Sequence, residues 1–78
     1  MQGRRLPDGW HTTDSEPGDY WRTPDGHWEI RDPLGNAGRI GTHTVEEHDD
    51  GTITVTPSIL DPDEGGYHGF LQHGVWTP

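Results

Sequence analysis

A short turn pattern that ends in glycine recurs along the chain and constrains its fold more than any other feature. Two polar or proline residues are followed by glycine at, among others, residues 7–9, 24–26, 49–51 and 72–74. A three-residue hairpin loop has a type I turn followed by a residue at positive φ, where glycine has no steric cost. Proline presets the first turn position and aspartate suits the second. The pattern predicts β-hairpins joined by tight turns.

The turn at 49–51 allows a strand register to be derived. A three-residue loop pairs Val45 with Val55 on one apolar face and leaves Glu46 and several threonines on the other. A two-residue loop would oppose Val55 to Glu46 and mix apolar with charged side chains on both faces. Because a one-residue slip inverts every side chain, the three-residue loop is strongly favoured. The sequence predicts this hairpin over about residues 42–59.

The same rule applied to the turn at 24–26 gives a second hairpin. It pairs Tyr20 with Ile30 and Arg22 with Trp28. A guanidinium opposite an indole ring is placed for a cation–π contact.

Applied to the turn at 72–74, the rule gives a third hairpin. It pairs Leu71 with Val75 and Phe70 with Trp76. Aromatic cross-strand pairs of this kind stabilise a sheet.

Composition supports an all-β fold with a thin core. No segment of 11 or more residues has a helical period, and 12 Gly with 7 Pro leave little room for one. We predict a small antiparallel meander or open barrel of about five to six short strands, built from hairpins with three-residue turns. Residues 1–78 are expected to form one small β domain, in which residues 1–19 are irregular or partly flexible.

The aromatic side chains supply most of the bulk that this chain can bury. It has four Trp, two Tyr and one Phe, against only 12 Leu, Ile, Val and Phe residues in total. We predict Trp28 and Phe70 in the core. Trp10 and Trp76, near the termini, are predicted to be exposed anchors for a partner, since Trp is enriched at interfaces.

Histidine is abundant, with six residues, whereas cysteine is absent. A metal site would need three or four converging ligands without any thiolate. The register derived above separates His43 from His48 on opposite faces. His68 is the best single candidate, with His11 or His27 as a companion, but no spacing matches a known ligand signature. We expect no metal site.

No catalytic motif is visible, and we predict that the protein is not an enzyme and uses no cofactor. Ser15 and Ser58 are the two serines, and Ser58 lacks the flanking glycines of a nucleophile elbow. The acidic residues at 61–64 match a calcium loop only in part. The glycine-containing loop at 35–38, with Arg39, is followed by a predicted strand, not a helix, so the phosphate-loop pattern is incomplete.

The net charge excludes two classes of partner. With 5 basic and 14 acidic residues the formal net charge is -9, and all five basic residues are arginines. A nucleic-acid binder is expected to carry a basic face, so neither nucleic acid nor an anionic membrane is an expected partner. No apolar run is long enough to span a bilayer and no signal peptide is visible, which favours a cytoplasmic location.

Two stretches resemble an uncharacterised family of small proteins from actinobacterial phages and their hosts. They are DGTITVTPSI at 50–59 and YHGFLQHGVW at 67–76, where the family motifs read DGTITVxPSI and WHGFLxxGVW. Tyr67 stands where the family pattern has Trp. The resemblance covers residues 27–76 and carries no function. It implies a phage or prophage origin and an accessory role, in the host cytoplasm or the virion.

These observations predict a small acidic phage accessory protein that binds another protein, as a host-takeover factor, a counter-defence factor or a minor virion component. Self-association or edge pairing would add the burial that the core lacks. Two alternatives stay open: a small-ligand binder, such as a sponge for a nucleotide signal, and an acidic DNA mimic. The residues predicted for ligand or partner binding are Trp10, Trp76, Tyr67, His68 and Arg39.

Overall fold

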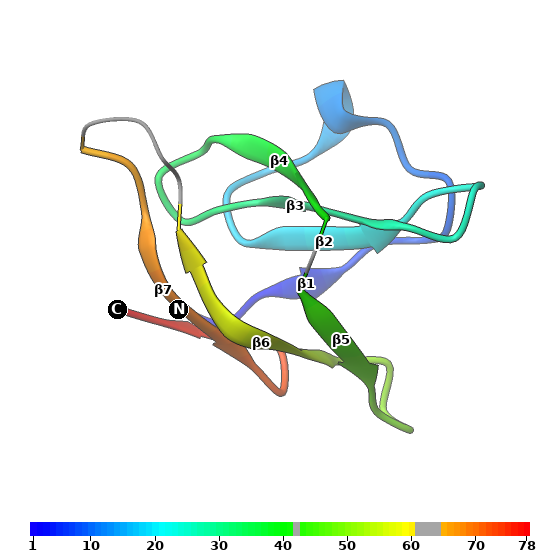
Figure 1. Ribbon diagram of the computed structural model, residues 1–78. Helices are drawn as coiled ribbons and strands as arrows, with labels where there is room; N and C mark the ends of the chain where they lie inside the picture. Colours follow the sequence, from blue (N-terminus) through cyan, green and yellow to red (C-terminus); the bar gives the residue numbers. More distant parts are fainter. Residues whose placement is uncertain (42, 61–64) are drawn as a thin grey trace.

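A computed structural model describes residues 1–41, 43–60 and 65–78, which form two four-stranded sheets (Figure 1). The first sheet contains β1 (Arg4–Arg5), β2 (Asp19–Arg22), β3 (Trp28–Arg31) and β4 (Ala37–Ile40). The second contains β5 (Thr44–Glu47), β6 (Ile53–Leu60), β7 (His68–Gln72) and β8 (Val75–Thr77). Spatial order follows sequence order in both sheets. The all-β prediction is confirmed.

The described strands number eight, more than the five to six predicted. The three hairpins account for six of them, and β1 and β4 are additional. β4 begins at Ala37, inside a stretch whose composition predicts a loop. β1 lies in the N-terminal region predicted to be irregular, pairs in parallel with β2, and is followed by a single 3-10 turn at Thr12–Asp14.

The N-terminal residues join the two sheets. The α-amino group of Met1 donates to the carbonyl of Trp76 at 2.9 Å, and the Trp76 amide donates to the carbonyl of Met1 at 2.8 Å. The amide of Gly3 donates to the carbonyl of Gly74 at 2.7 Å. From the next residue, Arg4, the chain pairs with β2 instead. Residues 1–5 therefore contact β8 of one sheet and β2 of the other.

The predicted registers of the first two hairpins are confirmed. Val45 pairs with Val55 across the turn at 49–51, and Tyr20 pairs with Ile30 across the turn at 24–26. The glycine that ends each turn has a φ near +85°, as a three-residue loop of this type requires.

The cation over the Trp28 ring is not the predicted one. Arg22 does pair with Trp28 across the ladder. The guanidinium above the indole, however, belongs to Arg5, whose Cζ lies 4.6 Å from the ring centroid. β1 adds a strand beside β2 that the sequence did not indicate, and this strand brings Arg5 to the ring.

The predicted register of the third hairpin is wrong by one residue. Leu71 pairs with Trp76 across a two-residue loop, in which His73 and Gly74 have φ angles of 47° and 75°. Two residues at positive φ form a type I′ turn, whose twist matches that of the flanking strands. The slip inverts the faces, so that Trp76 is 2% exposed, whereas Phe70, predicted in the core, is 43% exposed.

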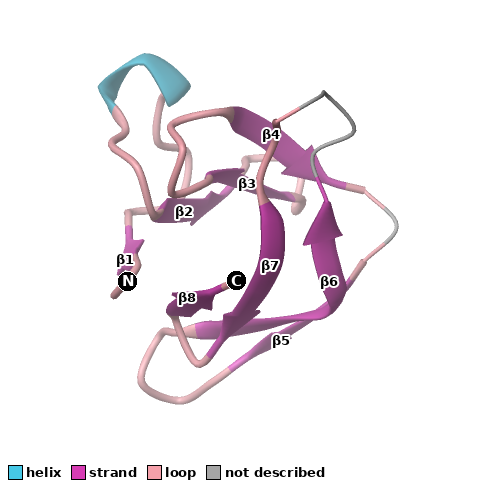
Figure 2. Ribbon diagram, turned by 90° about the vertical axis from the view of Figure 1, so that its left-hand side faces the viewer, coloured by secondary structure: helices cyan, strands magenta, loops and turns pink. Residues whose placement is uncertain are grey.

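The core lies between the inner faces of the sheets, which curve toward each other (Figure 2). Its buried members are Tyr20, Trp28, Ile30, Ile40, Ile53, Val55, Ile59, Leu71 and Trp76. The prediction for Trp28 is confirmed. The Trp76 indole N–H donates to the carbonyl of Gly18 at 2.9 Å, so the largest side chain of the second sheet is anchored at the start of β2.

Two buried apolar side chains, Leu6 and Trp21, are 5% and 1% exposed but do not belong to the central core. Strand alternation places Trp21 on the outer face of the first sheet, opposite to Tyr20. The segment that covers this face is bonded to β3. The Arg31 guanidinium donates to the Ser15 hydroxyl at 2.8 Å and to the Thr12 carbonyl at 3.0 Å. No helix in the described ranges is long and apolar enough to cross a membrane.

Candidate functional site

The outer face of the second sheet carries almost no charge. The strands β6, β7 and β8 contain no Asp, Glu, Lys or Arg, in a chain whose charged residues make up 24%. Strand alternation and the register place the following residues on their outer side, here called the neutral face: Thr54, Thr56, Ser58, Leu60, His68, Phe70, Gln72, Val75 and Thr77. Depletion of charge is typical of the centre of a protein interface.

Three exposed apolar side chains cross the neutral face. Leu60, Phe70 and Val75 are 61%, 43% and 36% exposed and belong to β6, β7 and β8. Leu60 pairs with His68, which lies two residues before Phe70 on β7. Phe70 in turn pairs with Thr77, which lies two residues after Val75 on β8. Diagonal neighbours of this kind are about 7–8 Å apart. The apolar side chains therefore form a line that runs over three strands.

A serine and two histidines lie near the Leu60 end of this line. The Ser58 hydroxyl is 3.4 Å from Nε2 of His68, and His43 Nε2 is 2.9 Å from the Ser58 carbonyl oxygen. A general base that activates a nucleophile sits within about 2.6–3.2 Å of it. The Ser58–His68 distance is longer than this range. The two side chains provide hydrogen-bonding groups on the neutral face.

Two stacked imidazoles border the neutral face at its opposite end. The rings of His48 and His73 lie 3.8 Å apart with an interplanar angle of 10°. The Thr54 hydroxyl holds both residues: it lies 2.7 Å from His48 Nε2 and accepts the His73 backbone N–H at 3.0 Å.

The residues predicted to bind a ligand or partner are not brought together. Trp10 is 37% exposed, on the loop that covers the first sheet, and its indole N–H donates to the carbonyl of Asp14 at 3.1 Å. Trp76, predicted to be an exposed anchor, is buried in the core. The prediction rested on its position near the chain terminus, whereas the observed pairing with Leu71 places it on the buried face of the sheet.

Tyr67 packs against the core instead of lining an open site. Its ring meets Trp76 edge-on, 5.5 Å between centroids, and its hydroxyl donates to the Thr77 carbonyl at 2.7 Å. Burial raises the pKa of the Tyr67 phenol, and the Asp32 carboxylate adds to the shift. Of the predicted residues, His68 alone lies on the neutral face.

Arg39 belongs to a polar cluster on the first sheet. Its guanidinium is 3.4 Å from the Asp25 carboxylate and 3.9 Å from that of Glu29. A hydrogen bond from Thr23 lowers the pKa of Asp25 to about 2, with smaller contributions from His27 and Arg39. Arg39 is thus already paired with carboxylates.

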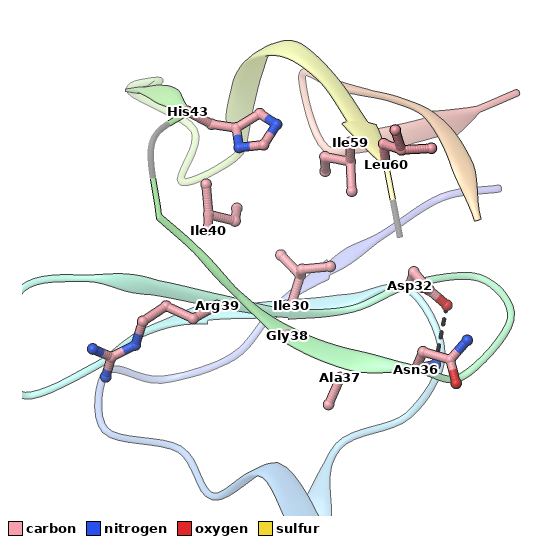
Figure 3. Close-up of a pocket in the computed structure, with 10 residues that line it drawn as sticks. All are labelled: Ile30, Asp32, Asn36, Ala37, Gly38, Arg39, Ile40, His43, Ile59 and Leu60. Carbon is pink, nitrogen blue, oxygen red and sulfur yellow. Dashed lines mark hydrogen bonds between the residues drawn. The ribbon is translucent and has the colours of Figure 1, made fainter. Parts of the chain in front are cut away.

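A cavity of about 350 Å³ lies between the first sheet and the end of β6 (Figure 3). Its lining comprises Ile30, Asp32, Asn36, Ala37, Gly38, Arg39, Ile40, His43, Ile59 and Leu60. The Arg39 side chain points away from it (Figure 3), and none of the four Trp lines it. A small-ligand binder would build its site from the Trp and His set, Arg39 and the loop at 35–38; of these, Asn36, Ala37, Gly38, Arg39 and His43 line the cavity.

Within residues 1–41, 43–60 and 65–78, no group of three or more His, Asp or Glu lies close enough to hold a metal ion. The partial calcium pattern at 61–64 falls outside the described residues. Comparison with protein-family models, with curated proteins and with solved structures found no match. Geometry and charge are accordingly the basis of the functional assignment.

Proposed function

We propose that this protein is a non-enzymatic protein-binding module and that the neutral face is its binding surface. The observation that carries the proposal is the line of Leu60, Phe70 and Val75 across three uncharged strands of a chain with a net charge of -9. An exposed apolar line surrounded by polar residues is typical of a protein interaction site.

Charge indicates the chemistry of the partner. Outside the neutral face, the second sheet carries Glu46, Glu47, Asp49 and Asp50 on β5 and its turn, of which Glu47 is paired with Arg5 of the first sheet. A partner with an apolar patch bordered by Lys or Arg would complement this arrangement. A second copy of the chain would bring the same negative charge and is the less favoured occupant. The phage accessory role remains a proposal based on the sequence resemblance.

Site-directed photocrosslinking tests the proposal. A photoreactive benzoylphenylalanine at position 70 should capture a partner in the native host, whereas the same group at position 34 should not. Leu34 is a matched control because it is 59% exposed on the turn between β3 and β4, away from the neutral face. The captured protein is then purified and its affinity measured directly.

With the purified partner, Phe70→Thr should weaken binding at least about 30-fold, as expected for an interface anchor worth about 2 kcal/mol. Leu34→Thr should leave the affinity unchanged. Equal affinity of the wild type and Phe70→Thr would refute the neutral face as the binding surface. A crosslink between two copies of the chain would show that the neutral face mediates self-association and does not bind a basic partner.

A further inference from the structure

β4 is an edge strand with free backbone groups. In the part of the chain that the structure describes, it pairs with β3 alone. The Asp32 amide donates to the Asn36 carbonyl at 2.9 Å just before the ladder begins. Because hydrogen-bonded and non-hydrogen-bonded pairs alternate in an antiparallel ladder, Gly38 and Ile40 bond to β3. Ala37 and Arg39 therefore direct their N–H and C=O groups away from it.

The cavity lies directly beside this free edge, on the inner side of the sheet (Figure 3). Ile30, Ile40 and Ile59, each at most 9% exposed, contribute apolar side chains to it, and Leu60 lies at its border. A Cβ added at Gly38 would meet no described heavy atom within 4 Å. The cavity is thus open next to the middle of β4 and has room for an aliphatic side chain from outside.

The surroundings of the edge are acidic. Asp25 and Glu29 lie on the outer side of the first sheet, where Arg39 pairs with both and the Arg31 guanidinium is bonded to the Ser15 hydroxyl and to the Thr12 carbonyl. Asp32 lines the cavity, where its carboxylate accepts the amides of Leu34 and Asn36 at 2.9 and 3.0 Å. Three carboxylates against two guanidiniums leave a negative balance at this edge, which favours a cationic occupant, in agreement with the overall charge of -9.

We propose that the free edge of β4 and its cavity bind an extended basic segment of a partner protein, which adds a fifth strand to the first sheet. Main-chain hydrogen bonds to Ala37 and Arg39 would supply affinity, and a pocket for alternate side chains would supply specificity. One branched aliphatic side chain of the segment enters the cavity, while the Lys or Arg residues on either side of it lie on the outer side of the sheet, next to Arg39 and the Asp25 and Glu29 carboxylates with which it pairs. This site differs from the neutral face in position and in the chemistry that it recognises.

A simple peptide tests this site without knowledge of the natural partner. The probe is a fluorescein-labelled peptide of sequence KVKVKVK, and EVEVEVE is its charge-reversed control. Anisotropy is measured at about 0.15 M salt, where exposed charges are substantially screened. We expect saturable binding of KVKVKVK, no binding of EVEVEVE, and changes in the ¹⁵N NMR amide signals of residues 37–40.

Three variants separate the contributions of the β4 edge, the cavity and the neutral face to peptide binding. Ala37→Pro removes one edge donor, and Gly38→Leu fills the cavity without touching the edge. Each should weaken binding at least tenfold. Phe70→Thr, on the neutral face, should leave it within twofold. Far-UV circular dichroism checks folding, and Gly38→Leu alone suffices if Ala37→Pro does not fold, because the space at Gly38 is open.

Three results would overturn the proposal. They are the absence of saturable binding at millimolar KVKVKVK, a peptide affinity that neither Ala37→Pro nor Gly38→Leu changes, and amide signal changes confined to the neutral face. Because Leu60 borders both surfaces, Phe70→Thr and Gly38→Leu are the variants that distinguish them. Loss of peptide binding in Gly38→Leu with normal partner binding at the neutral face would show two independent sites. Dimer formation through β4 would identify a second copy as the occupant instead.

Discussion

The first sheet covers its outer face with its own chain, whereas the second leaves the corresponding face open to solvent. On the first, Trp21 is 1% exposed, and the segment around the 3-10 turn is bonded to Arg31 of β3. On the second, Phe70 is 43% exposed in the middle strand of β6–β7–β8. Both are aromatic residues on an outer sheet face, so the difference lies in what covers them. We infer that the second sheet keeps this face available for a partner.

The largest expected effect comes from truncating these two aromatic residues. Trp21→Ala should lower the free energy of unfolding by about 3–5 kcal/mol, the usual cost of removing a buried Trp. Phe70→Ala should cost less than about 1 kcal/mol, because its side chain is already half in solvent. Guanidinium denaturation followed by circular dichroism measures both. Equal losses would show that the two faces are equally structural.

The indole of Trp76 provides a test of how the sheets are joined. Trp76→Phe keeps an aromatic ring in the core but leaves the Gly18 carbonyl with only the longer hydrogen bond from the Arg4 amide, at 3.3 Å. Because the net contribution of one hydrogen bond is about 0.5–1.5 kcal/mol, stability should fall by that amount in the same denaturation experiment. Trp10→Phe, whose indole also donates to a carbonyl but at 37% exposure, is the control and should change stability little.

Arg5 and Arg22 both reach Glu47 from the first sheet, but only Arg5 does so at hydrogen-bond distance. Arg5 lies 2.9 Å from Glu47 and also donates to the Gly51 carbonyl at 2.8 Å, whereas Arg22 approaches Glu47 to 4.0 Å. Arg5→Gln should destabilise by about 1.5 kcal/mol, as for hydrogen bonds made by a charged group. Arg22→Gln should stay within about 0.5 kcal/mol. The reverse order would contradict the assigned link between the sheets.

The smallest effect concerns the equivalent turn aspartates of the two sheets, Asp25 and Asp50. A hydrogen bond from Thr23 lowers the pKa of Asp25 from 3.8 to about 2, and one from Thr52 lowers the pKa of Asp50 as well. A carboxyl whose pKa is lower in the folded state stabilises the fold above its ordinary pKa. This contribution is lost as the pH falls from about 4 toward 2.

Carboxyl ¹³C NMR titration measures these two groups separately. Thr23→Val should raise the titration midpoint of Asp25 toward its ordinary value and leave that of Asp50 in place. Thr52→Val should do the converse. A midpoint for Asp25 that does not respond to Thr23→Val would show that the hydrogen bond is not the cause of its lowered pKa.

The sequence was sufficient for two hairpins because their strands alternate clearly. At the turn 49–51, a slip would place Glu46 opposite Val55, so one register is much better than the other. At the turn 72–74, apolar residues occupy both faces in either register. Nothing in the pattern indicates that His73 adopts a positive φ, which non-glycine residues rarely do. The predicted register placed Phe70 and Trp76 on one face, whereas the observed register places them on opposite faces.

The remaining differences between the predicted and the observed strands arise from tertiary contacts. β1 is only two residues long, and it forms because residues 1–5 lie between two sheets. β4 begins with Ala37 and Gly38, which have low β-propensity, and its pairing with β3 determines its structure. The neutral face, in contrast, could have been found: residues 51–60 and 65–78 contain no charged side chain. That signal was present in the sequence.

The most direct test of the difference between the two sheets is a pair of measurements on Phe70→Thr, which keeps a β-favouring residue in β7. We expect the free energy of unfolding to stay within about 1 kcal/mol of wild type while affinity for the partner crosslinked from position 70 falls at least about 30-fold. A loss of several kcal/mol in stability, or an unchanged affinity, would contradict the assignment of this face to a partner.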